Sequence, residues 1–341
     1  MVGRFYERNC RKTDIITRMK VKILPRVGKV NDGVSRYMAS LVTALESLGV
    51  EIVETGSYDV LHLVAAHRYD REWRAAKARG ARLIVTVHDL IPEHFGLVGP
   101  QYSDVAMRRE VLEAADAIIA VSQFTKDDVV STYGISPKRI HVVHNGAERA
   151  LYSPSQSSLR KQVEQPFILW VGRRAGYKNF LWFVWSVAPL LWKHDWKVVC
   201  TGGQAFGRKE KLLIGLLGLA RRFENVRVDD ASLHQLYQDA LCLVMPSKSE
   251  GFGLPVVEAM ANGCPVVIPR AHVFPEIAGG AALYFEPGDG RMMRRFICQC
   301  ANAQVRGILA ERGRKQARQY SWKTCAEKVK AVYECDLFAL L

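Results

Sequence analysis

Apolar residues in this chain gather in short runs that are separated by longer segments of mixed polarity. In the first half the runs occupy residues 60–64, 83–87, 115–122 and 140–144. In the second half they occupy residues 167–171, 196–200, 241–246 and 265–269. Continuous apolar runs of this length are typical of strands that are buried on both faces of a parallel sheet. The repeated alternation with helical segments predicts an α/β fold with two doubly wound halves.

One stretch, residues 241–269, combines a strand, a glycine-rich loop, a helix and a second strand. Pro255 stands where the helix begins, a position that suits proline because the missing N–H would have no partner there. The Asn-Gly pair that follows Ala261 ends the helix. Gly251 and Gly253 lie in the loop, where the lack of a side chain lets the backbone approach a ligand closely.

This loop has the chemistry of a site for an anion beside a sugar. The free N–H groups at the start of the helix favour a phosphate. Glu250 and Glu258 would repel a phosphate, but each carboxylate can accept hydrogen bonds from hydroxyl groups. The combination predicts a nucleotide-sugar site. The alternative is an ordinary strand-to-helix turn with two solvated glutamates.

The sequence E-G-F-G-L-P-x-x-E, followed by A-x-x-x-G-x-P-V-V, resembles the signature of the retaining glycosyltransferases of family 4, the glycosyl transferases group 1. The resemblance implies the GT-B fold, in which two Rossmann-like doubly wound domains face an interdomain cleft. It also implies a set of donor-binding residues in this motif: Glu250, Gly251, Phe252, Gly253, Leu254 and Glu258. Within this set the resemblance gives Glu250 a catalytic role.

The loop at residues 31–37, N-D-G-V-S-R-Y, is similar to the family's G-G-x-x-R-Y loop. In the family the glycines of this loop touch the donor phosphates or the reacting centre. Gly33 matches the pattern, whereas Asp32 replaces the first glycine. The resemblance therefore makes Gly33 a candidate donor contact, and the alternative is a simple helix-start glycine.

The sequence H-D-L-I-P at residues 88–92 leaves the carboxyl end of a predicted strand, which is where doubly wound sheets bind ligands. It resembles the H-D-L-x-P of mannosyltransferase-like members, in which the histidine lies beside the transferred sugar and the acceptor. His88 is thus a catalytic candidate, with a structural histidine as the alternative, and Asp89 is expected to order the loop. The other histidines near strand ends are expected to be structural: His62, His67 and His144.

Two basic residues, Arg173 and Lys178, flank the start of the helix after the strand at 167–171. They resemble the basic pair in the family's V-G-R-x-x-x-x-K-N. A departing nucleoside diphosphate gains negative charge, and two fixed cations can neutralise it without a metal. Both residues are predicted to bind the donor and to assist catalysis, the alternative being two surface cations.

The domain organisation follows from the motifs, from a polar segment between the two halves and from the final amphipathic segment. We expect a basic extension at 1–18, an acceptor-side domain at 19–150, a linker at 151–165, a nucleotide-sugar domain at 166–320 and a helix at 321–341. The resemblance to GT-B proteins implies that this helix crosses back to the first domain. A length of 341 residues and a hydrophobic content of 49% agree with two domains that have ordinary cores. Eight cysteines without a C-x-x-C pair indicate a reduced cytosol rather than zinc or disulfides.

The net charge of +14 is distributed unevenly. Residues 1–30 contain nine basic and two acidic residues, and residues 291–330 contain eleven and two. Such segments suit an anionic membrane surface, and mere solubility is the alternative. The apolar run at 180–192 is too short to span a bilayer, no signal peptide is evident, and the apolar helix expected at 211–223 is predicted to be buried. We therefore predict a cytoplasmic protein, peripheral on the cytoplasmic face of the inner membrane.

Together the residue patterns and the family resemblance predict a metal-independent hexosyltransferase without a cofactor, and the resemblance alone implies that it retains the anomeric configuration. It would move a hexose, with GDP-mannose as the suggested donor, to a glycan or lipid-linked acceptor in cell-surface polysaccharide or lipopolysaccharide assembly. The alternative is a non-catalytic protein that binds nucleotide sugars or anionic membranes. A dehydrogenase is disfavoured because G-x-G-x-x-G is missing, and a nucleic-acid partner because no RNP-type or finger pattern occurs. No D-x-D pair that would chelate a metal occurs in a strand-end loop.

Overall fold

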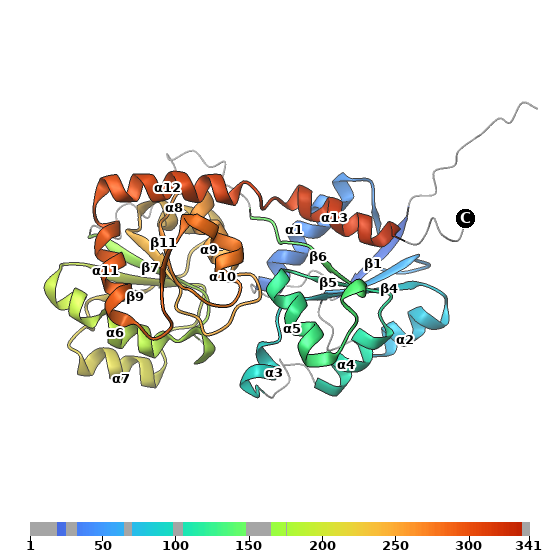
Figure 1. The fold of residues 1–341 in the computed structure, drawn as a ribbon, viewed down its shortest axis with the longest axis horizontal. Coiled ribbons are helices and arrows are strands. Elements are labelled where there is room, and N and C mark those ends of the chain that lie inside the picture. The colour runs from blue at the N-terminus through green and yellow to red at the C-terminus, as the bar shows by residue number, and fades with distance from the viewer. Residues whose placement is uncertain are drawn as a thin grey trace, which may run out of the picture.

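The computed structural model of the protein describes residues 19–24, 33–64, 70–97, 105–147, 165–174 and 176–335. These residues form two six-stranded parallel sheets that lie in two halves of the molecule, side by side along its long axis (Figure 1). Helices cover both faces of each sheet. The predicted α/β class with two doubly wound halves is confirmed.

The first sheet has the strand order β2-β1-β3-β4-β5-β6. Its strands are β1 (Lys20–Leu24), β2 (Glu51–Ile52), β3 (Val60–Leu63), β4 (Arg82–Val87), β5 (Ala117–Ala120) and β6 (Ile140–Val142). Its helices are α1 (Gly33–Ser47), α2 (Asp70–Ala78), α3 (Ile91–Phe95), α4 (Val105–Ala114) and α5 (Gln123–Tyr133). Helices α2, α4 and α5 pack on one face and α1 on the other. Every pair of neighbouring strands is parallel.

The second sheet has the strand order β12-β11-β10-β7-β8-β9, again all parallel. Its strands are β7 (Phe167–Val171), β8 (Lys197–Thr201), β9 (Phe223–Asn225), β10 (Cys242–Val244), β11 (Val266–Pro269) and β12 (Leu283–Phe285). Its helices are α6 (Phe180–Lys193), α7 (Arg208–Leu216), α8 (Asp230–Asp239), α9 (Leu254–Ala261), α10 (Phe274–Ala278), α11 (Gly290–Cys300) and α12 (Ala303–Ala317). Helices α6, α7 and α11 cover one face, whereas α8, α9 and α10 cover the other.

The order of the second sheet reverses between β7 and β10, which lie next to each other although other strands and helices separate them in sequence. At such a reversal the loops at the carboxyl ends of the two strands diverge to opposite faces and leave room for a ligand. The loop after β7 begins with Gly172, and the loop after β10 contains Gly251. The fold therefore places both predicted donor motifs at the position where this sheet is expected to bind a ligand.

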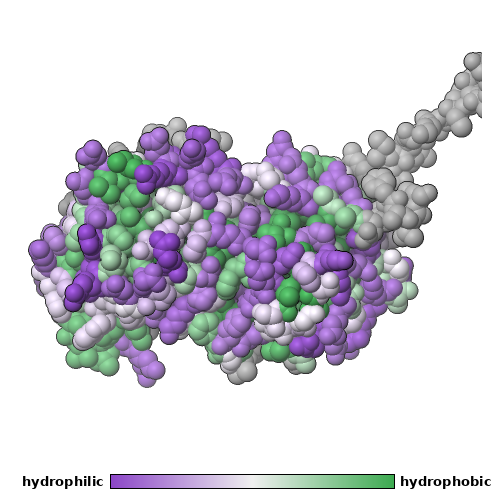
Figure 2. Space-filling model, in the orientation of Figure 1, coloured by the Kyte–Doolittle hydropathy of each residue, from purple (hydrophilic) through white to green (hydrophobic). Residues whose placement is uncertain are grey.

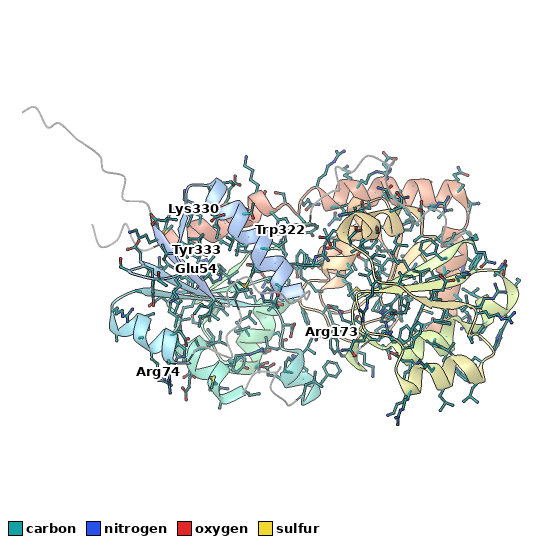
Figure 3. All side chains as sticks on the ribbon, turned by 180° about the vertical axis from the view of Figure 1, so that it is seen from behind. Glu54, Arg74, Arg173, Trp322, Lys330 and Tyr333 are labelled. Carbon is teal, nitrogen blue, oxygen red and sulfur yellow. The ribbon has the colours of Figure 1, made fainter. Side chains whose placement is uncertain are left out.

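The last helix, α13 (Trp322–Glu334), returns from the second half and packs on α1 and the first sheet (Figures 1 and 3). Its apolar side chains, among them Val329 and Tyr333, belong to the same core cluster as Val21 and Leu41. A Cβ atom on Gly146 would lie 2.3 Å from the backbone nitrogen of Trp322, so the start of α13 is pressed against the end of the first domain.

Several local expectations differ from the structure. The helix expected at 211–223 is α7, which ends earlier because Gly218 adopts a left-handed conformation with φ of 68°. The strand expected at 226–228 lies at Phe223–Asn225. The extension at 1–18, Asp32, His67 and nearly all of the linker lie outside the described residues. Within the described part of the chain, no helix is long and apolar enough to span a membrane.

Candidate functional site

The glycine-rich loop after β10 leads directly into α9. Gly253 has φ of 82°, a left-handed conformation that glycine adopts without strain, and it precedes the first residue of the helix. Pro255 occupies the first turn, and Gly263 at φ of 75° follows the end of the helix. No side chain caps the start of α9. Pro255 has no N–H and that of Val256 donates to the carbonyl of Gly253 over 2.8 Å, so the N–H of Leu254 is the one that remains available to an anion among these three residues.

A close ion pair lies at the reversal of the second sheet. The Nζ atom of Lys178 donates to Oε1 of Glu250 over 2.5 Å, and both side chains are largely buried. The two loops are also joined by their backbones, since the N–H of Lys248 donates to the carbonyl of Tyr177 over 2.7 Å. Glu250 therefore fixes the Lys178 ammonium group beside the loop that leads to the start of α9.

Arg173 and Arg174 differ sharply in their surroundings although they are adjacent. Arg173 is exposed and makes no hydrogen bond or ion pair with any residue that the structure describes. It lies on the side of the second half that faces the first half (Figure 3). The guanidinium of Arg174 donates to Glu210 and Asn225 over 3.0 Å each, so it is structural. Of these two adjacent arginines, Arg173 is thus the one that can reach a ligand.

Glu258 lies in α9 with its carboxylate almost fully buried. Its Oε2 accepts a hydrogen bond from the Tyr237 hydroxyl at 2.9 Å, and its Oε1 lies 3.1 Å from Nη2 of Arg36 in α1. Burial raises the pKa of Glu258, and Arg36 and Tyr237 partly counteract that rise. The sequence analysis did not single out Arg36. The available signal was its position one turn after Gly33, within the motif at residues 31–37 that resembles a donor-binding loop of the family.

The glycine-rich loop touches the carboxyl edge of the first sheet. A Cβ atom on Gly251 would lie 1.6 Å from the backbone oxygen of His88, which is possible only for glycine. The carbonyl of Gly251 accepts hydrogen bonds from Ser122 Oγ at 2.7 Å and Thr125 Oγ1 at 3.2 Å. The structure therefore brings His88 and the loop of Glu250 together across the two halves.

The ring of His88 packs edge-on against Tyr37, with 4.7 Å between ring centroids. Asp89 accepts a hydrogen bond from the N–H of Ile91 at 3.1 Å, which orders the loop as expected. Burial raises the pKa of Asp89. Gly33 is the first residue of α1, and Leu254 is the first of α9.

Phe252 is buried, and its ring packs against those of His144 and Tyr320, with centroids 6.0 and 5.7 Å away. Its side chain thus belongs to the packing between the halves, and only its backbone can face a donor. Ser122 caps α5, since its Oγ accepts from the N–H of Thr125.

Glu276 forms a second bridge between the halves. Its carboxylate accepts hydrogen bonds from the backbone N–H groups of Gln123 and Phe124 at the start of α5, and it lies 2.7 Å from Nε2 of His144. Burial would raise the pKa of Glu276, but these hydrogen bonds outweigh burial and lower it. His144 is thus structural, as expected, and the bridge joins α10 of the second half to the start of α5 in the first half.

His62 lies fully buried beneath this site, between the Tyr333 hydroxyl at 2.6 Å and Thr86 Oγ1 at 2.7 Å. Burial, with a smaller contribution from His88, lowers the pKa of His62 from 6.5 to about 3. The unfolded chain therefore binds a proton below pH 6.5 that the folded protein does not bind until about pH 3. Stability that is present at neutral pH is lost as the pH falls through this window.

We expect His62 to lower the free energy of unfolding by about 2 kcal/mol between pH 7 and pH 5, because each pKa unit corresponds to about 1.4 kcal/mol. Urea titrations at both pH values measure the change. His62→Gln keeps an amide that can bond to Thr86 and Tyr333 but does not titrate, so its pH dependence should be flatter. An equal pH dependence in both proteins would contradict this role.

Among the described residues, no group of three or more His, Cys, Asp or Glu side chains is placed to hold a metal ion. The charged groups of the donor motifs and their partners are instead two ion pairs, Lys178 with Glu250 and Arg36 with Glu258, and the exposed Arg173. This arrangement offers cations and the positive end of a helix to a diphosphate, and carboxylate oxygens to hydroxyl groups.

Two family models match the chain. Glycosyl transferases group 1 matches residues 165–302, and Glycosyltransferase Family 4 matches residues 51–151. O-antigen chain mannosyltransferase B of Escherichia coli is 28% identical over 74% of this chain and 70% of its own length. The MMP alpha-(1->4)-mannosyltransferase of Mycolicibacterium hassiacum is 28% identical over 70% of this chain and 58% of its own length.

Solved structures with the same fold include sucrose-phosphate synthase from Thermosynechococcus elongatus, with a TM-score of 0.76 and 19% identity over 95% of this chain and 100% of that one. Anabaena HepE in complex with UDP-glucose gives a TM-score of 0.74 and 20% identity over the same shares of both chains. The predicted GT-B fold is therefore confirmed. With both halves matched by models of one family and the donor motifs joined at the sheet reversal, the chain belongs to glycosyltransferase family 4, the group 1 glycosyl transferases.

Proposed function

We propose that this protein transfers a hexose from a nucleoside-diphosphate sugar to a glycan or lipid-linked acceptor with retention of anomeric configuration. The observation that carries the proposal is the buried pair of Lys178 and Glu250 at the reversal of the second sheet, beside the uncapped start of α9. A cation next to the positive end of a helix suits a diphosphate better than any neutral ligand. Arg173, exposed on the side that faces the first half, adds a second cation.

Each residue has a defined task in the proposed reaction. Lys178 and Arg173 neutralise the charge that grows on the diphosphate as the bond to the sugar breaks. Glu250 holds Lys178 in position and presents its second carboxylate oxygen to sugar hydroxyl groups, while Glu258 accepts from the ribose. Arg36 already contacts Glu258, so the nucleotide has to share or displace this contact.

No side chain is assigned as a covalent nucleophile. The acceptor hydroxyl attacks the anomeric carbon from the face that the diphosphate leaves, and its proton passes to the departing phosphate oxygen. This route produces retention of configuration with the groups that are present. His88, whose backbone touches the glycine-rich loop, borders the transferred sugar and positions it for attack.

Mannose is the proposed sugar and GDP-mannose the proposed donor, since relatives that span most of this chain are named as mannosyltransferases. The relative from Escherichia coli is named for the O-antigen chain, which supports a role in surface polysaccharide or lipopolysaccharide assembly. The acceptor is proposed to lie at the cytoplasmic face of a membrane, where residues 1–30, with nine basic and two acidic residues, would attract anionic lipids.

A panel of GDP-, UDP- and ADP-linked sugars tests the donor. We expect GDP-mannose to raise the melting temperature most and to be hydrolysed slowly in the absence of an acceptor. Stabilisation by a different sugar nucleotide would move the proposal to that donor. No stabilisation and no hydrolysis with any member of the panel would favour a non-catalytic protein instead.

Metal chelation tests the proposed charge neutralisation. We expect hydrolysis of the donor to persist in excess EDTA, because Lys178 and Arg173 supply the positive charge that a metal ion would otherwise provide. Rates measured before chelation, after chelation and after re-addition of Mg²⁺ or Mn²⁺ give the comparison. Complete loss of turnover that returns with the metal would contradict the assignment of these two cations.

A further inference from the structure

Helix α6 is apolar on its outer face as well as on its inner face. Its inner side chains, such as Phe183 and Val187, are fully buried against the second sheet. Its outer face nevertheless presents Leu181, Trp185 and Trp192, which are 42%, 64% and 61% exposed. A helix at the surface of a soluble protein normally turns polar residues outward. The outer stripe of α6 therefore indicates a contact that the described residues do not provide.

Helix α7, next to α6, continues this stripe. Leu212 and Leu216 are 64% and 76% exposed and lie one turn apart on the same face. Together with the three residues of α6 they account for most of the large hydrophobic side chains that are exposed in the described chain. Apolar surface gathers over α7 at the lower left of Figure 2. We call Leu181, Trp185, Trp192, Leu212 and Leu216 the α6–α7 face.

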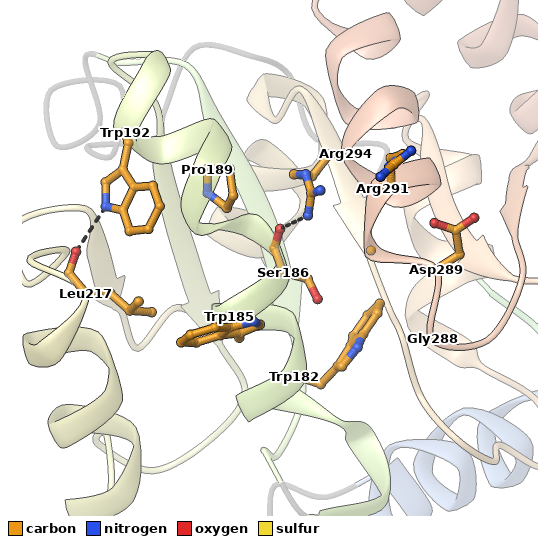
Figure 4. Close-up of a pocket in the computed structure, with 11 residues that line it drawn as sticks. Trp182, Trp185, Ser186, Pro189, Trp192, Leu217, Gly288, Asp289, Arg291 and Arg294 are labelled. Carbon is orange, nitrogen blue, oxygen red and sulfur yellow. Dashed lines mark hydrogen bonds between the residues drawn. The ribbon is translucent and has the colours of Figure 1, made fainter.

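The side chain of Trp192 in this face is fixed by a hydrogen bond. The indole of Trp192 donates to the carbonyl of Leu217 over 3.0 Å and so ties the end of α6 to the end of α7. A groove of about 580 Å³ runs along α6, with Trp182 and Trp185 on one side and Arg291 and Arg294 on the other (Figure 4). Arg294 is fixed by a bond to the carbonyl of Ser186 at 2.9 Å.

Most charges around the α6–α7 face are basic, and the acidic residue that lines the groove, Asp289, accepts a hydrogen bond from the N–H of Met292 over 2.8 Å at the start of α11. The first turn of α7 carries Arg208, Lys209 and Lys211, all exposed, and Lys193 is exposed at the end of α6. The acidic residue of this turn, Glu210, forms an ion pair with Arg174, which neutralises its charge. Arg291 is exposed at the mouth of the groove. Positive charge thus surrounds exposed tryptophan and leucine.

This combination favours a lipid surface over a protein partner. Lysine is depleted at protein–protein interfaces, whereas tryptophan and leucine flanked by Lys and Arg are typical of segments that lie in a membrane interface. Indole rings prefer the headgroup level, and basic side chains attract anionic lipids. We propose that the α6–α7 face docks on an anionic membrane, with Trp185, Trp192, Leu212 and Leu216 entering the interface and a lipid phosphate lying in the groove beside Arg291.

The residues of the α6–α7 face are different from those assigned to the donor site. Helices α3 and α7 lie along the same edge of the molecule in Figures 1 and 3, so a membrane at α7 also faces the α3 side of the first half. Docking itself does not depend on the reaction. Only its use, the delivery of a lipid-linked acceptor, rests on the proposed function.

Sedimentation with vesicles tests the proposal on the full-length protein. Vesicles of phosphatidylcholine alone and with phosphatidylglycerol are compared at low salt. We expect the protein to sediment with the anionic vesicles, and the variant Trp185→Ser/Leu216→Ser to bind at least fivefold more weakly. A second variant, with Arg208, Lys209 and Lys211 replaced by Gln, should lose binding to a similar extent. The matched control is Ile308→Ser, which changes an exposed apolar residue of α12 away from this face.

Hydrolysis of the donor, measured in the same samples, separates a folding defect or a failed reaction from a failed contact. A further variant replaces Arg4, Arg8, Arg11, Lys12 and Arg18 by Gln. If binding is lost only in that variant and is unchanged in both variants of the α6–α7 face, the proposal is overturned. It is also overturned if the protein ignores anionic vesicles and instead forms a dimer that the Trp185→Ser/Leu216→Ser variant loses in light scattering.

Discussion

Lys178→Ala is expected to lower kcat by about 10- to 100-fold, because a hydrogen bond to a charged group contributes about 1.5–3 kcal/mol. The substitution removes the cation nearest the proposed diphosphate and leaves the largely buried carboxylate of Glu250 without its partner. Arg173→Ala should lower kcat to a similar extent. The exposed Arg173 makes no bond to the described residues, so its loss should leave the melting temperature unchanged.

The readout is hydrolysis or transfer at saturating donor, with the melting temperature measured in parallel. Arg79→Ala, which removes an exposed cation after α2 in the first half, is the matched control and should behave as the unaltered protein. If both Lys178→Ala and Arg173→Ala turn over at the unaltered rate, the proposed neutralisation of the diphosphate is wrong. If only Lys178→Ala is impaired, the second cation must be sought elsewhere in the cleft.

Gly251→Ala is expected to abolish measurable turnover, a loss of at least about 100-fold, since a shift of about 1 Å at an active site already costs that much. The new Cβ atom would meet the backbone oxygen of His88 at 1.6 Å, and neither backbone can yield without separating the two halves. The carbonyl of Gly251 would also move away from Ser122 and Thr125. Glu250 and His88 would then no longer share one site.

Gly307→Ala is the control for this substitution. Gly307 lies in α12, and a Cβ atom added to it would have no other atom within 4 Å. Alanine should therefore stabilise that helix slightly and leave turnover unchanged. Small-angle scattering and turnover are measured for both variants. Normal turnover in Gly251→Ala would show that the contact between His88 and the glycine-rich loop is not needed for the reaction.

The sequence was sufficient to predict the strands of both sheets, because parallel strands that are buried on both faces must be continuously apolar. Strands β4, β7 and β11 lie within or at the predicted runs, and the start of α9 falls where Pro255 indicates. The bounds of α7 were predicted less accurately, at 211–223 instead of Arg208–Leu216. An apolar helix with basic ends does not reveal which of its faces is covered, since that depends on neighbours such as α6.

The candidate site also contains residues that short sequence motifs reveal and residues that they do not. Residues that act through the local backbone, such as Gly253 and Ser122, can be recognised from short motifs because their partners lie within one turn. The bridge from Arg36 to Glu258 and that from Glu276 to α5 join distant segments, and neither has a local pattern. Phe252 shows the opposite case, where a motif residue serves the packing between the halves.

The return of α13 to the first sheet has a consequence for the newly made chain. The first half leaves the ribosome first, yet one face of its sheet lacks Val329, Tyr333 and their neighbours until the second half has also been translated. The second half has its own helices, α6 to α12, available earlier. Domains usually fold in the order in which they are synthesised. Here the domain that is made first is the last to be completed, and its exposed sheet face has to be kept from aggregating during translation.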